Sequence, residues 1–281
     1  LPAAYWYYGL TIIGLGLLST AIIVKKDWKL LVLHINIAAL ILPFEIVVLV
    51  VFKAYRYLPG IMHDPTLDNF LGAYVSNFII VPATAVTINA FSLSWSYSLG
   101  LAAIFSVIDW YFVQIGIYQH FWWKSVYTGM GLIILYAISK RLWAWLQEKS
   151  PSQLFRLITI YLTYTPIHNI LVFIVNKGGQ LFWFQVNWPG GPERVHQMLF
   201  QLYLAITSCV ITLCIGLKLR LRYRLIGIVV LVMINWSIDK YHIFVPHTAD
   251  VSAYQLIFVP MIAVPIVIIL FRVAKLDYLF P

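Results

Sequence analysis

The sequence predicts an all-α polytopic membrane protein, a bundle of about nine transmembrane helices. Apolar residues make up 62% of the 281 residues and charged residues only 10%, against about 45–50% and about 25% in soluble domains. The mean hydropathy is +0.87. Apolar stretches also recur at a length of about 20 residues, which a helix needs to cross the hydrocarbon core of a bilayer. We therefore expect residues 1–281 to form a single transmembrane domain.

Nine stretches have the length and composition of a membrane span. They cover residues 5–24, 28–52, 70–91, 95–116, 125–145, 155–176, 197–216, 225–244 and 253–274. Inside hydrocarbon every backbone N–H and C=O group must find a partner within its own segment, so each stretch is expected to be helical. The short connections between them predict that neighbouring spans run in opposite directions.

The basic residues predict the orientation of the chain in the membrane. The net charge is +9, from 19 Lys and Arg against 10 Asp and Glu. A basic balance can indicate nucleic-acid binding, but here the cations lie in short loops between spans, where they orient membrane proteins. They are most frequent after the first, fifth, seventh and ninth spans, which predicts an outside N-terminus, a cytoplasmic C-terminus and no nucleic-acid partner.

A short repeated motif predicts a parallel internal repeat. Ile108-Asp109-Trp110 recurs as Ile234-Asn235-Trp236 roughly 126 residues later, and each motif precedes a turn that contains histidine. Because four spans separate the copies, both would have the same orientation in the membrane. The expected copies cover about residues 1–124 and 125–250.

Several strongly polar residues lie inside the predicted spans, where each ionisable group costs roughly 2.5–3.5 kcal/mol. Counted at about 1.5 Å per residue from the cytoplasmic ends, polar groups of four spans lie about 15–25 Å up the helix, and Asn77 lies about 10 Å below the outer surface. This common depth predicts one polar layer in the outer half of the bundle.

We expect this layer to form a ligand-binding pocket that opens outward, with Asp109 as its anionic centre and Lys124 as the counter-ion. The predicted ligand-binding residues are Glu45, Asn77, Asp109, Lys124, His168, Asn235 and Asp239. The alternative is that these groups are interhelical hydrogen bonds, worth about 0.6 kcal/mol each. The turns above the layer are rich in Trp, Tyr and His, which is typical of an aromatic belt at the membrane surface.

The sequence predicts no cofactor and no catalytic residue. It lacks a Walker A loop, GxGxxG, GxSxG and HExxH. The nearest arrangement to a metal site is His242, His247 and Asp250 close to Asp239, because zinc accepts nitrogen and oxygen ligands of this kind. An axial haem pair of His34 and His168 is not expected, since the two residues differ by about 10 Å in depth.

The segment from about Asp68 to Leu146 contains the span SNFIIVPATAVTINAF, the helix end SVIDWYF, the segment KSVYTGMGL and the basic end SKRLW. In these features it is similar to a family of uncharacterised integral membrane proteins from spore-forming bacilli and clostridia. The family usually has glutamate where this chain has Asp109. The resemblance implies a multi-pass protein of the cell membrane of a Gram-positive bacterium, and it implies no activity.

Together these features predict an integral membrane protein that binds or transports a small molecule or a lipid through an outward-facing polar pocket. One alternative is a membrane-embedded enzyme that acts at the outer leaflet, in which Asp109 or Asp239 with a histidine would do acid–base work or hold a metal. The other is a non-catalytic subunit of a membrane complex. The expected partners are the lipid bilayer, a small-molecule or lipid ligand, and a membrane protein partner.

Overall fold

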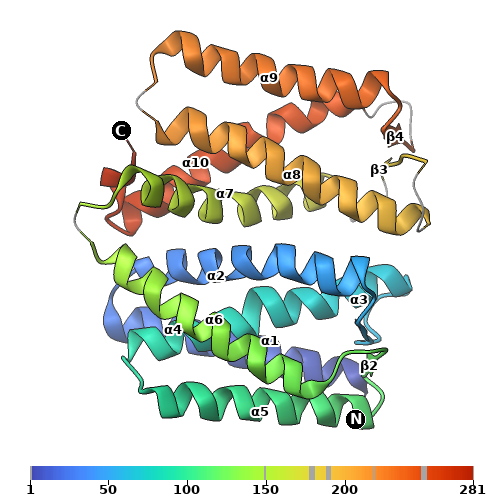
Figure 1. Cartoon of the computed structure of the whole chain (residues 1–281), viewed down its shortest axis with the longest axis vertical. Helices are drawn as coiled ribbons and strands as arrows, with labels where there is room; N and C mark the ends of the chain where they lie inside the picture. Colours follow the sequence, from blue (N-terminus) through green and yellow to red (C-terminus); the bar gives the residue numbers. More distant parts are fainter. Residues whose placement is uncertain are drawn as a thin grey trace. The chain divides into compact units, whose positions relative to one another are not determined.

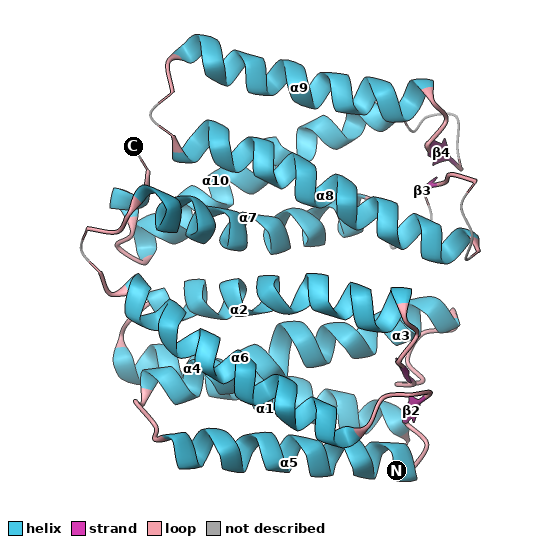
Figure 2. Cartoon of the chain, viewed as in Figure 1, coloured by secondary structure: helices cyan, strands magenta, loops and turns pink. Residues whose placement is uncertain are grey.

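The computed structural model describes residues 2–148, 150–176, 181–187, 191–217, 219–247 and 252–280. In these residues helices dominate, and the strands are limited to two small two-stranded sheets (Figures 1 and 2). The prediction of an all-α polytopic helix bundle is thereby confirmed. The helices group into two compact units, Leu1–Ser150 (unit 1) and Pro151–Pro281 (unit 2).

Unit 1 contains five long helical segments. Its elements are α1 (Ala3–Lys25), α2 (Lys29–Glu45), η1 (Ile46–Val51), β1 (Tyr55–Tyr57), α3 (Pro65–Tyr74), η2 (Val75–Ile80), α4 (Val81–Ala90), α5 (Trp95–Gln114), β2 (Tyr118–His120) and α6 (Ser125–Leu146). Both η1 and η2 are π-helical stretches. They continue their neighbours, so that Lys29–Val51 and Pro65–Ala90 each form one apolar span.

Unit 2 contains four long helices. Its elements are α7 (Gln153–Val175), β3 (Phe182–Phe184), α8 (Pro192–Gly216), α9 (Leu221–Lys240), β4 (Phe244–Pro246), η3 (Ala253–Ile257), α10 (Phe258–Val273) and η4 (Asp277–Leu279). Here η3 and η4 are single 3-10 turns. The C-terminal helix α10 packs against α7, the first helix of the unit.

Each predicted span corresponds to a helix. In the described residues eight helices are long and apolar enough to cross a membrane. The ninth, α6, has 22 residues, enough for the roughly 20 that a span requires, but Lys140 and Arg141 near its end make it less apolar. Helix α9 begins four residues before the predicted span, because its first turn accommodates Arg222 and Arg224, which an apolar criterion rejects.

The two units share an order of elements. In unit 1 the strand after α2 pairs with the strand after α5, and in unit 2 the strand after α7 pairs with the strand after α9. The flanking hydrogen bonds also correspond: Leu58 N–H donates to the Ile117 carbonyl, and Gln185 N–H donates to the Ile243 carbonyl. The spacing between equivalent strands equals that of the repeated IDW and INW motifs to within one residue.

Helix α1 packs so closely against η2 that only glycine fits at the contact. A Cβ atom added to Gly14 would lie 3.1 Å from the backbone Cα of Ile80 and 2.8 Å from the Ile79 side chain. Because backbone atoms cannot move aside without shifting the helix, we expect Gly14→Ala to lower the free energy of unfolding by about 1–3 kcal/mol. Thermal unfolding in detergent measures the effect.

Gly9 and Gly16 on the same helix are matched controls, because a Cβ atom there meets nothing within 4 Å. Alanine at either position should leave stability unchanged or raise it slightly, since alanine has the higher helix propensity. Equal melting temperatures for Gly14→Ala and the two controls would contradict the close α1–η2 contact.

Candidate functional site

Unit 1 contains a cavity of about 380 Å³, within the range of about 300–1,000 Å³ that is usual for small-molecule sites. Its lining comes from α1, α2, β1, η2, α4, α5, β2 and α6. Three of the predicted binding residues, Glu45, Asn77 and Asp109, line this cavity. The structure thus brings together polar groups from three separate spans, and their binding of a ligand stays a prediction.

Two of these residues lie at π-helical stretches. Glu45 is the last residue of α2 before η1, and Asn77 lies within η2. Pro43 precedes η1 inside α2, and Pro82 follows η2 at the start of α4. Wide π-turns frequently occur at functional sites in helices. Here they coincide with the cavity.

The Glu45 carboxylate is buried, with 7% of the residue exposed. Its Oε2 atom accepts a hydrogen bond of 2.7 Å from the Tyr55 hydroxyl, and the Asn77 amide lies against the same carboxylate. Neither Oε1 of Glu45 nor Nδ2 of Asn77 makes a hydrogen bond of good geometry in the protein. Glu45 and Asn77 therefore place an acceptor and a donor side by side in the lining of the cavity.

Asp109 on α5 is held by a chain of polar contacts from the adjacent turn and from α6. Its Oδ1 atom lies 3.0 Å from Nε2 of His120, and its Oδ2 atom accepts a 2.8 Å hydrogen bond from the Thr128 hydroxyl. Thr128 in turn accepts a 2.9 Å hydrogen bond from the Trp123 indole. These contacts compensate the burial of a carboxylate, which is otherwise costly.

Aromatic side chains from the β1–β2 sheet surround the polar end of the cavity. Tyr57 pairs with Tyr118 in the sheet, and their rings are 4.8 Å apart. Tyr55 lies 5.3 Å from the rings of both Tyr118 and Trp123. Burial, with the nearby carboxylates as a further cause, raises the pKa values of Tyr55, Tyr57 and Tyr118 well above the usual value. Their hydroxyl groups therefore stay protonated and can donate hydrogen bonds.

The other end of the cavity is apolar and reaches the surface of unit 1 along α6. Tyr127, Gly131, Ile134 and Ile138 all line the cavity and are all exposed. They recur every three or four residues, so they form one face of the helix. From Tyr127 to Ile138 this face is about 16 Å long. The exposed Phe44 of α2 lies on the lining as well, and α2 packs against α6.

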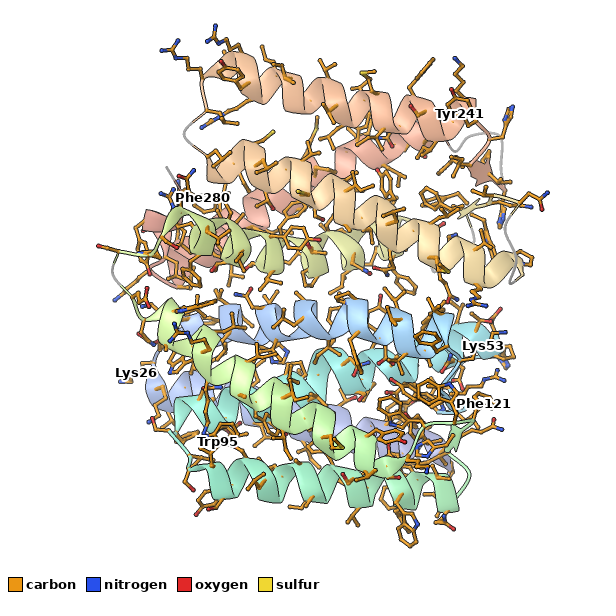
Figure 3. The ribbon with its side chains drawn as sticks, in the orientation of Figure 1. Lys26, Lys53, Trp95, Phe121, Tyr241 and Phe280 are labelled. Atoms are coloured by element: carbon orange, nitrogen blue, oxygen red, sulfur yellow. The ribbon has the colours of Figure 1, made fainter. Side chains whose placement is uncertain are left out.

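Lys124 does not belong to the lining. It is exposed and precedes the first residue of α6, and the contact expected of it is made by His120. The turns that contain β1 and β2 lie at the end of unit 1 that Figure 3 marks with the labels Lys53 and Phe121. At this end Phe121 N–H donates a hydrogen bond to the Ala54 carbonyl. Lys26 and Trp95 mark the opposite end (Figure 3).

Sequence reasoning missed His120, Thr128 and the tyrosines of the sheet. A usable signal was present, because alternate residues of a strand lie on one face. YRY and YQH each alternate in this way, and antiparallel pairing sets Tyr55 opposite His120 and Tyr57 opposite Tyr118.

The remaining predicted residues of the spans belong to unit 2. His168 is fully buried on α7, with Nδ1 lying 3.3 Å from the Ser208 hydroxyl and Nε2 lacking a hydrogen bond. Asn235 on α9 accepts a 3.3 Å hydrogen bond from the Tyr203 hydroxyl. Asp239 is exposed at the end of α9. None of them lines the cavity of unit 1.

The histidines considered as metal or haem ligands have other surroundings. His242 and His247 are exposed, and Asp250 lies outside the described residues. Across the part of the chain that the structure describes, no group of three His, Cys, Asp or Glu residues could hold a metal ion. His34 donates a 2.7 Å hydrogen bond to the carbonyl of Phe78 in η2.

Comparison with protein-family models, with curated proteins and with solved structures finds no match for this chain. The resemblance of residues 68–146 to a family of bacterial membrane proteins stays a prediction. Any functional conclusion therefore depends on the geometry of the cavity.

Proposed function

We propose that this integral membrane protein binds an amphiphilic small molecule or a lipid in the cavity of unit 1. One observation carries the proposal: a single cavity joins a polar end, at Glu45, Asn77 and Asp109, to an apolar, exposed face of α6. An amphiphile has the same division, with a polar head and an apolar chain.

The energetics favour such a ligand. An apolar chain that lies against α6 would make van der Waals contacts with apolar side chains over about 16 Å of helix, as packing inside a bilayer requires. A polar head would meet the Glu45 carboxylate and the Asn77 amide in the lining of the cavity, and buried polar groups need hydrogen-bond partners. Both ends of the molecule would therefore contribute to binding.

The loop charges give the proposal a direction in the membrane. The polar end lies beside the turns that contain β1 and β2, which the distribution of Lys and Arg predicts to be outside. The head group of an outer-leaflet lipid would then lie at about the same depth in the membrane as the polar end of the cavity. Binding is the step that the cavity supports, and transport would require a second opening toward the cytoplasm.

Photo-crosslinking tests the proposal. The full chain in lipid nanodiscs would be labelled with an uncharged lipid analogue that bears a diazirine in its acyl chain. We expect labelled peptides to include Leu132 and Phe112, which line the cavity and are almost fully buried. Tyr136 is equally buried on α6 but lies outside the lining, so it should stay unlabelled. Labelling of exposed side chains alone would contradict the proposal.

A membrane-embedded enzyme that acts at the outer leaflet is a second candidate. The contact between Asp109 and His120 favours it, because a carboxylate that orients an imidazole is a common arrangement in general acid–base catalysis. An enzyme would convert a bound lipid, and the product would appear in a lipid extract after incubation. His120→Gln should stop that conversion, whereas unchanged lipids with the wild type would exclude it for the lipids tested.

A further inference from the structure

We propose that the ligand of the unit 1 cavity carries an organic cation, an amine or a quaternary ammonium group, which lies between Glu45 and Asp109 among the aromatic side chains of the β1–β2 sheet. This inference rests on the proposed function and names the class of its ligand.

The charges at the cavity point to a cation. Among the described residues of the lining, Glu45 and Asp109 are acids, and none is lysine or arginine. Both carboxylates line the same cavity as the sheet tyrosines Tyr57 and Tyr118. An anionic head placed there would meet two carboxylates, and among the described residues His120 alone brings a basic side chain, to Asp109.

Glu45 is the principal binding group in this inference. Asp109 already has His120 and Thr128 as partners. Among the described residues Glu45 has only neutral partners, Tyr55 and Asn77. An opposite charge within about 4–6 Å favours the ionised form of a carboxylate. A bound cation would supply the charge that no described side chain brings to Glu45.

The aromatic residues point to an organic cation and not a metal ion. Tyr7, Tyr55, Tyr57, Tyr118 and Trp123 all line the cavity. Aromatic rings attract cations within about 6 Å, and aromatic cages are a common means of binding quaternary ammonium groups. A metal ion would instead require several oxygen or nitrogen ligands, and the described residues offer no group of three His, Cys, Asp or Glu.

Equilibrium binding to the wild-type protein is the primary test. The probes are dodecyltrimethylammonium and its uncharged isostere, in which carbon replaces the quaternary nitrogen, with empty nanodiscs as the blank for partition into lipid. We expect the protein to bind the cation roughly tenfold or more tightly than the isostere, as a desolvated cation–aromatic contact together with a carboxylate predicts.

Two variants test whether Glu45 causes the preference for the cation over its uncharged isostere. Glu45→Gln removes the charge and keeps the shape, and the cation should then bind about as tightly as the isostere. Asp239→Asn removes one exposed carboxylate outside the lining and should leave the preference unchanged. A preference that persists in Glu45→Gln, checked for folding by its melting temperature, would overturn the assignment to Glu45.

The wild-type measurement separates this inference from the proposed function and needs no variant. Equal binding of cation and isostere would overturn the cationic head group and leave an amphiphile site intact. If neither probe bound above the blank, both the inference and the proposed function would be wrong.

Discussion

Replacing Asp68 with alanine is expected to lower the free energy of unfolding by roughly 2–4 kcal/mol, a large effect for a single residue. The Asp68 carboxylate on α3 is buried and accepts hydrogen bonds of 2.8, 2.8 and 2.9 Å from the backbone N–H groups of Gly60, Ile61 and Met62. Alanine would leave all three donors without this acceptor. Chemical or thermal unfolding of the purified protein measures the loss.

Asp64 provides the matched control for this prediction. Its side chain caps α3 by accepting hydrogen bonds from the N–H groups of Thr66 and Leu67, but this position is exposed. Loss of an N-cap costs about 1 kcal/mol. Asp64→Ala should therefore be clearly milder than Asp68→Ala, and equal effects would contradict the structural role assigned to Asp68.

Gly131→Phe is expected to abolish binding of an amphiphile while leaving the protein folded. Gly131 lies on the exposed face of α6 that lines the cavity, and a Cβ atom there would meet nothing within 4 Å. A phenyl ring at this position would occupy the space that the proposed chain requires. The measurement is diazirine labelling of Leu132, which should fall to background.

Gly100→Phe serves as the control for the added ring. Gly100 on α5 is also exposed and free of neighbours around its Cβ position, but it does not line the cavity. This variant should be labelled as strongly as the wild type. If labelling of Leu132 were lost in both variants, the cause would be the added membrane-facing ring and not a blocked cavity.

The helical architecture could be predicted from the sequence because the bilayer restricts the options. Backbone groups in hydrocarbon must be paired within a helix, so apolar stretches of the right length identify the spans directly. The limits were less accurate: α9 begins four residues before its predicted span, since arginines in its first turn are compatible with a helix but not with an apolar window.

The candidate site could be predicted only in part. The rise of a helix gives the height of a residue in the membrane, and it brought Glu45, Asn77 and Asp109 to one layer. Height does not tell which helices are neighbours. His168 and Asn235 were assigned to the same layer by the same arithmetic, yet they belong to unit 2 and have partners there.

The partners of Asp109 depended on a contact that no helical pattern encodes. Charge alone favours Lys124, the lysine nearest to Asp109 along the chain. The antiparallel β1–β2 pairing instead fixes the turn so that His120 reaches Oδ1 of Asp109. Pairing between strands far apart in sequence depends on how the helices pack, which is why the sequence alone did not identify His120.

The most direct test of the amphiphile site is an experimental density map of the full chain, purified from its own membranes in a mild nonionic detergent. We predict elongated density along Tyr127, Gly131, Ile134 and Ile138, ending in a compact feature between Glu45 and Asp109. A map that shows ordered lipid elsewhere on the protein but only solvent in this cavity would contradict the proposal.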